Sequence, residues 1–199
     1  IGANEIRDRE LTTLNRLCSY IKSAVTDHHY FDNYFINYKI PQIGKEFDLL
    51  RIGEDTLINI ELKSEKMEES KILDQLQRNF YYLSFLGRTI DCYTFLTDGN
   101  IDKLYYYNSS SNVLEIVQDI NHLLLKIYQL MDSNIENIDC LFEPCNYLIS
   151  PFNTTEAFIT SRYFLTNRQE QIKEEIIKEI DNDSANKIFS IAGRAGTGK

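Results

Sequence analysis

The sequence predicts an α/β fold, in which a central mixed sheet is covered by helices. Apolar residues recur at helical spacing in residues 3–25 and 69–86, and shorter apolar or alternating runs lie between and after these segments. The resulting order is helix, three strands, helix, two strands, helix, which is typical of an α/β domain. With 199 residues, 43% of them hydrophobic, the chain can build one good core and a second, partial unit.

The first helix is expected at residues 3–25. One acid, Glu10, shares the apolar face of this helix, because it lies four residues before Leu14 and seven before Leu17. The residues that define this face are Ile6, Leu14, Leu17 and Ile21.

Three strands are expected next. Residues 32–40 are rich in aromatic side chains and alternate in polarity, and Pro41 ends this run. Residues 46–52 and 56–63 are also expected to be strands, and the turn "GED" between them suits a hairpin.

The second half of the domain begins with an amphipathic helix at 69–86, which Gly87 is suited to end. Strands are expected at 89–97 and 102–108, and a further helix at 112–131. The core-facing residues of the 69–86 helix are expected to be Ile72, Leu76, Phe80 and Leu83.

The chain changes character after residue 131. Residues 132–160 contain two prolines and several Asn without a sustained period, which predicts a linker between a domain at 1–131 and a further unit at 161–199. This linker is expected to pack on a folded part, because it carries large apolar residues: Leu141, Phe142, Tyr147 and Phe152. Helix is expected again after residue 160, followed by the short apolar strand "KIFSIAG".

Composition narrows the class of protein. The net charge of −9 argues against a wholly basic surface, although a local basic groove needs only a few Lys and Arg. The four cysteines lack the CxxC spacing of a zinc site and suggest the reduced thiols of a cytoplasmic protein. Neither a signal peptide nor an apolar span of about twenty residues is evident, so no membrane partner is expected. Because the first residue is Ile, we expect a fragment or a processed chain.

Three charged residues stand where strands 46–52 and 56–63 should be apolar. Glu61 and Lys63 point to the same face, because residues two apart in a strand share a face, and Asp48 can lie level with them across the hairpin. Two converging carboxylates repel unless a cation lies between them, and Mg²⁺ prefers such oxygen ligands. A lysine beside them can orient or deprotonate a water molecule, or stabilise charge on phosphorus, so the arrangement suits phosphodiester hydrolysis.

Asp48 followed by Glu61-Leu62-Lys63 resembles the D…(D/E)xK signature of the PD-(D/E)XK nuclease superfamily. The expected element order is similar to that family's core of helix, three-strand meander, helix and strand. The resemblance covers roughly residues 3–108 and implies a restriction-endonuclease-like core, here with a helical C-terminal extension.

The resemblance also implies further site residues. Family members often carry an acid on the first helix, which matches Glu10, and the carbonyl of Leu62 is a plausible extra ligand beside the metal-binding Asp48 and Glu61. Members similar to RecB and the NERD group carry a Gln on the following helix, often as QxxxY. Gln77 and Tyr81 match this spacing and are preferred over Gln75.

A second motif lies near residue 199. "GRAGTGK" fits the G-x-x-x-x-G-K pattern of a Walker A loop, in which backbone N–H groups and a lysine hold phosphates. Upstream, "FLTNRQEQI" resembles the adenine-reading Q motif of superfamily 1 helicases, with Gln169 in the place of the glutamine. The ATP-binding residues implied by this likeness are Gln169, Gly193, Gly196, Gly198 and Lys199.

Together these features resemble the N-terminal part of a nuclease–helicase fusion that ends just after the Walker A lysine. The expected activity is Mg²⁺- or Mn²⁺-dependent cleavage of DNA, with ATP used only by the full-length protein. The sequence leaves open RNA as substrate, single or double strands, and a role in DNA repair or in defence against phage. Two other hypotheses remain: an inactive nuclease-like module that docks DNA or a partner, and an ATPase that the first domain regulates as a cap.

Overall fold

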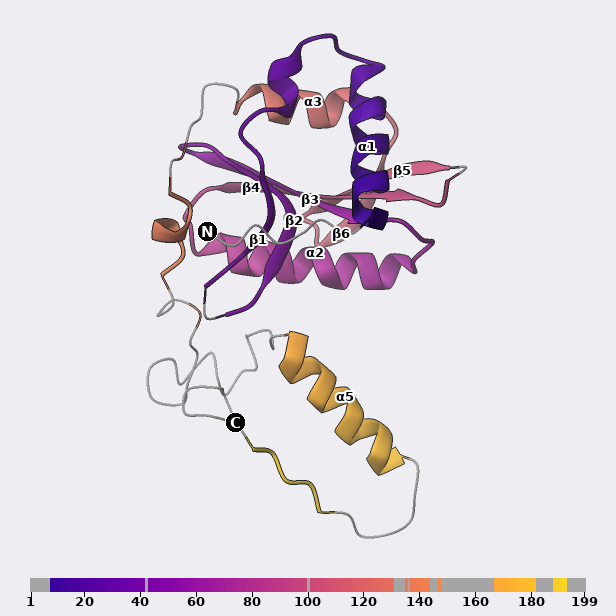
Figure 1. Ribbon diagram of the computed structural model, residues 1–199, viewed down its shortest axis with the longest axis vertical. Coiled ribbons are helices and arrows are strands. Elements are labelled where there is room, and N and C mark those ends of the chain that lie inside the picture. Colours follow the sequence, from indigo (N-terminus) through magenta and orange to yellow (C-terminus); the bar gives the residue numbers. More distant parts are fainter. Residues whose placement is uncertain are drawn as a thin grey trace. The chain divides into compact units, whose positions relative to one another are not determined.

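The computed structural model describes residues 8–41, 43–99, 101–130, 135, 137–143, 147, 167–181 and 188–192. Helices and strands alternate along the chain as in an α/β protein (Figure 1). Their bounds are α1 Asp8–Lys22, η1 His28–Phe31, β1 Phe35–Lys39, β2 Glu46–Ile52, β3 Thr56–Lys63, α2 Glu69–Ser84, β4 Thr89–Thr97, β5 Asp102–Asn108, β6 Val113–Val117, α3 Asn121–Tyr128, η2 Asp139–Leu141 and α5 Asn167–Asp181.

The six strands form one mixed sheet in the order β1-β2-β3-β4-β5-β6. Every neighbouring pair is antiparallel except β3 and β4, which are parallel. Helix α2 joins the two parallel strands, because a parallel pair needs a crossover connection and cannot be linked by a tight turn. The sheet therefore starts as a three-strand meander, crosses over through α2 and continues as a second meander.

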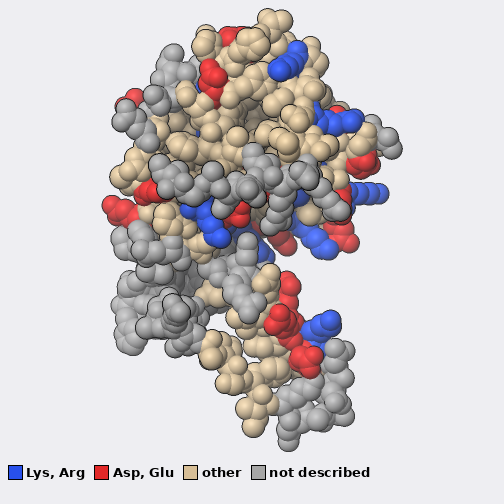
Figure 2. All heavy atoms as spheres, viewed as in Figure 1, with Lys and Arg blue, Asp and Glu red and all other residues tan. Residues whose placement is uncertain are grey.

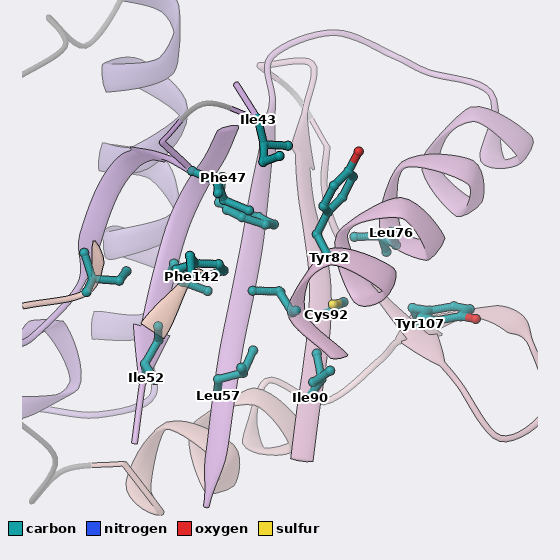
Figure 3. Close-up of a cluster of buried hydrophobic side chains, with 14 of the residues drawn as sticks. Ile43, Phe47, Ile52, Leu57, Leu76, Tyr82, Ile90, Cys92, Tyr107 and Phe142 are labelled. Carbon is teal, nitrogen blue, oxygen red and sulfur yellow. The ribbon is translucent and has the colours of Figure 1, made fainter. Parts of the chain in front are cut away.

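Helices cover both faces of this sheet. Helix α2 lies on one face, and α1 and α3 lie on the other (Figure 1). The core beneath α2 includes Leu57, Leu76 and Cys92, as Figure 3 shows, and the opposite core joins Leu17 of α1 to side chains of the sheet and α3. Because both faces are buried, the sequences of the central strands are almost continuously apolar. A polar residue within such a strand is therefore an exception.

Helix α2 ends at Ser84, two residues before the predicted end, and Gly87 closes the turn that follows it. Gly87 has a φ of 66°, a left-handed conformation that costs glycine little, and its N–H bonds to the carbonyl of Ser84. The chain then enters β4, whose residue Thr89 donates its N–H to the carbonyl of Asp55 in the β2–β3 turn.

The predicted α/β class is confirmed, but the helix predicted after β5 is partly wrong. The sequence predicts a helix over 112–131, whereas Val113–Val117 form the edge strand β6 and the helix is confined to Asn121–Tyr128. The apolar positions of this stretch fit both a helix and a short strand, and hydrogen bonds from β5 decide for the strand. Asp119 then accepts the N–H of Asn121 in the turn that opens α3.

The segment after α3 packs as its apolar residues predict. Phe142 is 2% exposed and lies in the core beneath α2, while Tyr147 stacks on Tyr82 with ring centroids 5.8 Å apart. Leu141 packs against the same core, and Phe152 lies outside the described residues.

The chain divides into two compact units, Ile1–Phe164 and Leu165–Lys199. In the smaller unit the predicted helix is present as α5, but residues 188–192 form no strand and their side chains are exposed. A strand needs a neighbour to pair with, and no described segment pairs with 188–192. The Walker A segment, Gly193 to Lys199, lies outside the described residues. No helix within the described ranges is long and apolar enough to cross a membrane.

Candidate active site

The three charged residues singled out from the sequence meet at one end of β2 and β3. Leu49 pairs with Ile60, so continuing this register by one residue sets Asp48 opposite Glu61. The side chain of Asp48 reaches across the hairpin, where its Oδ2 accepts the N–H of Leu62 at 2.7 Å. On β3, Ile60 and Leu62 belong to the core beneath α1 and α3, so Glu61 and Lys63 face α2.

Glu61 is the most deeply buried acid of the site, with 2% of its surface exposed. Its Oε1 accepts the side-chain amide of Asn79 at 2.7 Å and that of Asn59 at 3.4 Å, and its Oε2 accepts the amide of Gln75. A buried carboxylate is costly unless it is paired and hydrogen-bonded. These amides therefore fix one orientation of Glu61 without adding charge to the site.

Two lysines supply positive charge near the carboxylates. The Nζ of Lys63 lies 3.7 Å from Oε2 of Glu61, and the Lys63 side chain keeps 18% of its surface exposed. Lys45, which precedes β2, lies with its Nζ 5.2 Å from the ring centre of Phe47. Burial lowers the pKa of Lys45, and the charges of Glu61 and Asp48 oppose this shift, so Lys45 lies within electrostatic reach of both acids.

Asp48 has an unusual protonation equilibrium. Burial, and next the negative charge of Glu61, raise the pKa of Asp48 from 3.8 to about 7. The N–H of Leu62 and the charge of Lys63 act in the opposite direction. The charge of Glu61 thus adds to burial in destabilising the ionised form of Asp48, which a bound cation would offset.

Glu10 reaches the same site from α1. Its charge contributes to raising the pKa of Asp48, and its Oε2 accepts the side-chain amide of Asn37 at 3.4 Å. The helix that carries Glu10 covers the face of the sheet opposite to α2. A carboxylate from α1 therefore approaches the end of the β2–β3 hairpin that carries Asp48 and Glu61.

The contacts of α2 favour Gln75 over Gln77. Gln75 bonds to Glu61, and Asn79, one turn later, faces the same site. Gln77 instead donates to Oδ1 of Asn112 on the exposed side of the helix, at 2.8 Å. Tyr81 lies among aromatic rings, with Phe85 5.2 Å away between centroids. The QxxxY spacing thus identifies the right helix, but Gln77 does not contact Glu61.

Three residues of the site, Asn59, Asn79 and Lys45, are not predicted from the sequence. Asn59 and Asn79 are both fully buried and bonded to each other, with Asn79 Nδ2 2.6 Å from Asn59 Oδ1. Each carries a signal, since Asn59 interrupts the apolar run of β3 two residues before Glu61, and Asn79 interrupts the apolar stripe of α2. Lys45 has only a weak signal, because a lysine beside a hairpin usually faces solvent.

The donor set suits Mg²⁺ or Mn²⁺. No three His, Cys, Asp or Glu side chains are grouped closely enough to hold a metal ion by themselves in the part of the chain that is described. Mg²⁺ does not require such a group, because it commonly binds one or two carboxylates and completes its shell with water and substrate phosphates. Asp48 and Glu61 could supply hard oxygen ligands beside the Leu62 peptide unit, where the side chain of Asp48 accepts the N–H of Leu62.

The larger surface carries charge of both signs. Figure 2 shows acidic and basic side chains interspersed on the viewed face, which agrees with the net charge of −9. Local positive charge is instead found near the carboxylates, where Lys45 has both Lys63 and Arg78 within electrostatic reach. These cations could meet a phosphate backbone without a wholly basic protein surface.

The predicted ATP-binding residues are only partly covered by the structure. Gln169 is half-buried in the first turn of α5, and the remaining candidates, Gly193, Gly196, Gly198 and Lys199, lie outside the described residues.

No protein-family model, curated protein or solved structure matches this chain. A proposal about its function therefore depends on the site geometry and on the motifs of the sequence.

Proposed function

We propose that the larger unit is a Mg²⁺- or Mn²⁺-dependent nuclease that hydrolyses phosphodiester bonds of DNA. The observation that carries this proposal is the meeting of Asp48, Glu61 and Lys63 on one hairpin, with Lys63 Nζ 3.7 Å from Glu61 Oε2. Two acids and a lysine at this spacing combine a cation site with a group able to act on the attacking water. The amides around Glu61 support this reading, since they orient an acid that stability alone would not favour.

The topology also supports the proposal. Strands β1, β2 and β3 form a meander, α2 crosses over, and β4 lies parallel to β3, with α1 preceding the sheet. This arrangement resembles the restriction-endonuclease-like core of the PD-(D/E)XK superfamily. Asp48 lies on the second strand and Glu61 and Lys63 on the third, which is compatible with the signature of that family.

Each residue has a distinct role in the proposed reaction. Asp48 and Glu61, with the Leu62 carbonyl and Glu10 as further oxygen ligands, would hold the cation, which polarises the phosphate and its bound water. Lys63 hydrogen-bonds the attacking water or a phosphate oxygen and stabilises the negative charge that develops. The water gives up a proton to solvent as its oxygen forms a bond to phosphorus, the bond from phosphorus to the leaving sugar oxygen breaks, and that oxygen takes up a proton from solvent.

Cleavage of defined DNA tests this proposal. Single-stranded, double-stranded and nicked DNA, with RNA in parallel, are incubated with Mg²⁺, Mn²⁺ or EDTA and either the wild-type chain or Asp48→Asn. The proposal expects cleavage that needs the metal and falls at least about a hundredfold in Asp48→Asn. Asp55→Asn, in the exposed β2–β3 turn, is the matched control and should cut normally. Absence of cleavage on every substrate would contradict the proposal and favour an inactive module that docks nucleic acid or a partner.

The wider protein is proposed from sequence resemblance alone. Gln169 and the Walker A residues 193–199 would belong to an ATP-dependent superfamily 1 helicase module. A nuclease joined to such a motor would act in the cytoplasm on DNA, in repair or in defence against phage. ATP binding by a chain that continues beyond the motif, and its loss in Lys199→Ala, would test this part separately.

A further inference from the structure

Asn37 has a backbone conformation that is unusual for its place. Its φ is 50°, inside the strand β1, whereas the other two described non-glycine residues with positive φ, Asn33 and Asn112, lie between elements. A left-handed residue interrupts a strand and costs free energy, even for Asn. Such a conformation persists only where the surrounding structure holds it, and it is often found at functional sites.

The position of Asn37 connects it to the candidate active site. It lies between the β1–β2 pairs Ile36–Leu49 and Tyr38–Phe47, so it stands opposite Asp48. The left-handed backbone takes its side chain out of the regular alternation of the strand. Its amide Nδ2 then donates to Oε2 of Glu10, at 3.4 Å.

We infer that Asn37 is a positioning residue, which uses its left-handed backbone to direct the carboxylate of Glu10 towards Asp48. This inference depends on the proposed function, because the cation is what the positioned carboxylate would serve. Glu10 comes from α1 on the far side of the sheet, and its hydrogen bond with Asn37 at the sheet edge holds its side chain near the hairpin.

Asparagine suits this role better than glycine or aspartate. Glycine adopts positive φ freely but has no side chain to donate a hydrogen bond. Aspartate tolerates the same φ but would bring a negative charge against Glu10. Asparagine combines this backbone conformation with a short, neutral side-chain donor.

A double-mutant cycle tests the inference on the full 199-residue chain. Mn²⁺ affinity is measured by calorimetry, together with melting temperature and cleavage rate, for wild type, Asn37→Gly, Glu10→Gln and the double variant. We expect Asn37→Gly to keep or raise the melting temperature, because the strain is relieved, yet to weaken Mn²⁺ binding about tenfold. In the Glu10→Gln background the same substitution should change Mn²⁺ affinity less than about twofold, because the carboxylate that it positions is gone.

Two further variants sharpen the result. Asn37→Asp should weaken Mn²⁺ binding at least as much as Asn37→Gly does, because its carboxylate repels that of Glu10. Asn33→Gly relieves the same kind of backbone strain away from the site and should leave both Mn²⁺ affinity and cleavage unchanged.

The outcomes separate this inference from the proposed function. A wild-type chain that binds Mn²⁺ and cleaves DNA, with Asn37→Gly and Glu10→Gln effects that simply add, would overturn the positioning role and leave the nuclease intact. Wild-type affinity in Asn37→Gly would overturn it equally. A wild-type chain that binds no Mn²⁺ and cuts nothing would overturn the proposed function and this inference with it.

Discussion

The side-chain nitrogen of Asn79 lies 2.7 Å from Oε1 of Glu61, deep between helix α2 and the sheet. Both residues are almost wholly buried. A neutral amide thus offsets part of the free-energy cost of burying the Glu61 carboxylate. The same hydrogen bond links α2 to β3, the strand that carries Glu61 and Lys63.

Removing this amide should destabilise the fold. In Asn79→Leu, Glu61 and Asn59 each lose a buried hydrogen-bond partner, so we expect the free energy of unfolding to fall by about 2 kcal/mol. Urea unfolding measures the change. Gln77→Leu, on the exposed side of the same helix, is the control and should change stability by less than about 0.5 kcal/mol. Equal stability of wild type and Asn79→Leu would mean that the amide is not needed to keep Glu61 buried.

Helix α2 offers a direct comparison of two glutamines. Gln75 contacts Glu61, whereas Gln77 contacts Asn112, although the QxxxY spacing favours Gln77. We therefore expect Gln75→Leu to slow DNA cleavage about tenfold through the orientation of Glu61, and Gln77→Leu to cut at the wild-type rate. The reverse order of effects would show that Gln77 moves into the site when substrate binds.

The sequence predicts the parts of this protein that depend on local pattern. The presence of helix α2, the paired strands of the β2–β3 hairpin and the register that sets Asp48 opposite Glu61 all follow from spacing within short segments. These features need no knowledge of distant contacts, because periodicity and turn residues determine them.

The remaining features depend on tertiary contacts. The residues 113–117 fit both a helix and a strand, and only pairing with β5 makes them a strand. Similarly, Gln75 and Gln77 both lie on α2, and the rotation of the helix over β3 decides which one meets Glu61. The left-handed backbone of Asn37 has no local signal either, since nothing in "FINYK" requires a turn.

Asp48 should make stability depend on pH. Its pKa is raised from 3.8 to about 7, so between these values the folded protein binds more protons than the unfolded chain, and the free energy of unfolding falls as pH rises. Asp48→Asn removes this penalty and should be more stable than wild type at pH 8, by on the order of 1–2 kcal/mol. The gain is limited to this size because the variant loses the charged acceptor of the Leu62 N–H. Near pH 4 the gain should vanish. Thermal melts at both pH values check this, with Asp55→Asn as control, and a gain that is equal at both would contradict it.

Arg51 should stabilise the end of α3 from within the core. It is fully buried, with Nη2 3.1 Å from the carbonyl oxygen of Leu130 and its guanidinium carbon 5.4 Å from the ring centre of Tyr34. Arg51→Met leaves buried carbonyl groups without a donor, so we expect a loss of about 2 kcal/mol, and faster hydrogen exchange in α3. Arg16→Met breaks the partly exposed ion pair with Asp102 and should cost less than about 1 kcal/mol. A more stable Arg51→Met would mean that the cost of burying the charge dominates.

The central claim is that Lys63 acts in the chemical step. Lys63→Met removes the ammonium group 3.7 Å from Glu61, while phosphate contacts elsewhere should still bind DNA. The control Lys173→Met removes the same charge from the exposed surface of α5 in the smaller unit.

Single-turnover cleavage of DNA at saturating protein and Mn²⁺, measured together with DNA affinity and melting temperature, tests the claim most directly. The account predicts that Lys63→Met cleaves at least about a hundredfold more slowly than wild type, while its DNA affinity and melting temperature stay close to those of Lys173→Met. A Lys63→Met variant that cleaves near the wild-type rate would contradict the catalytic role of this lysine.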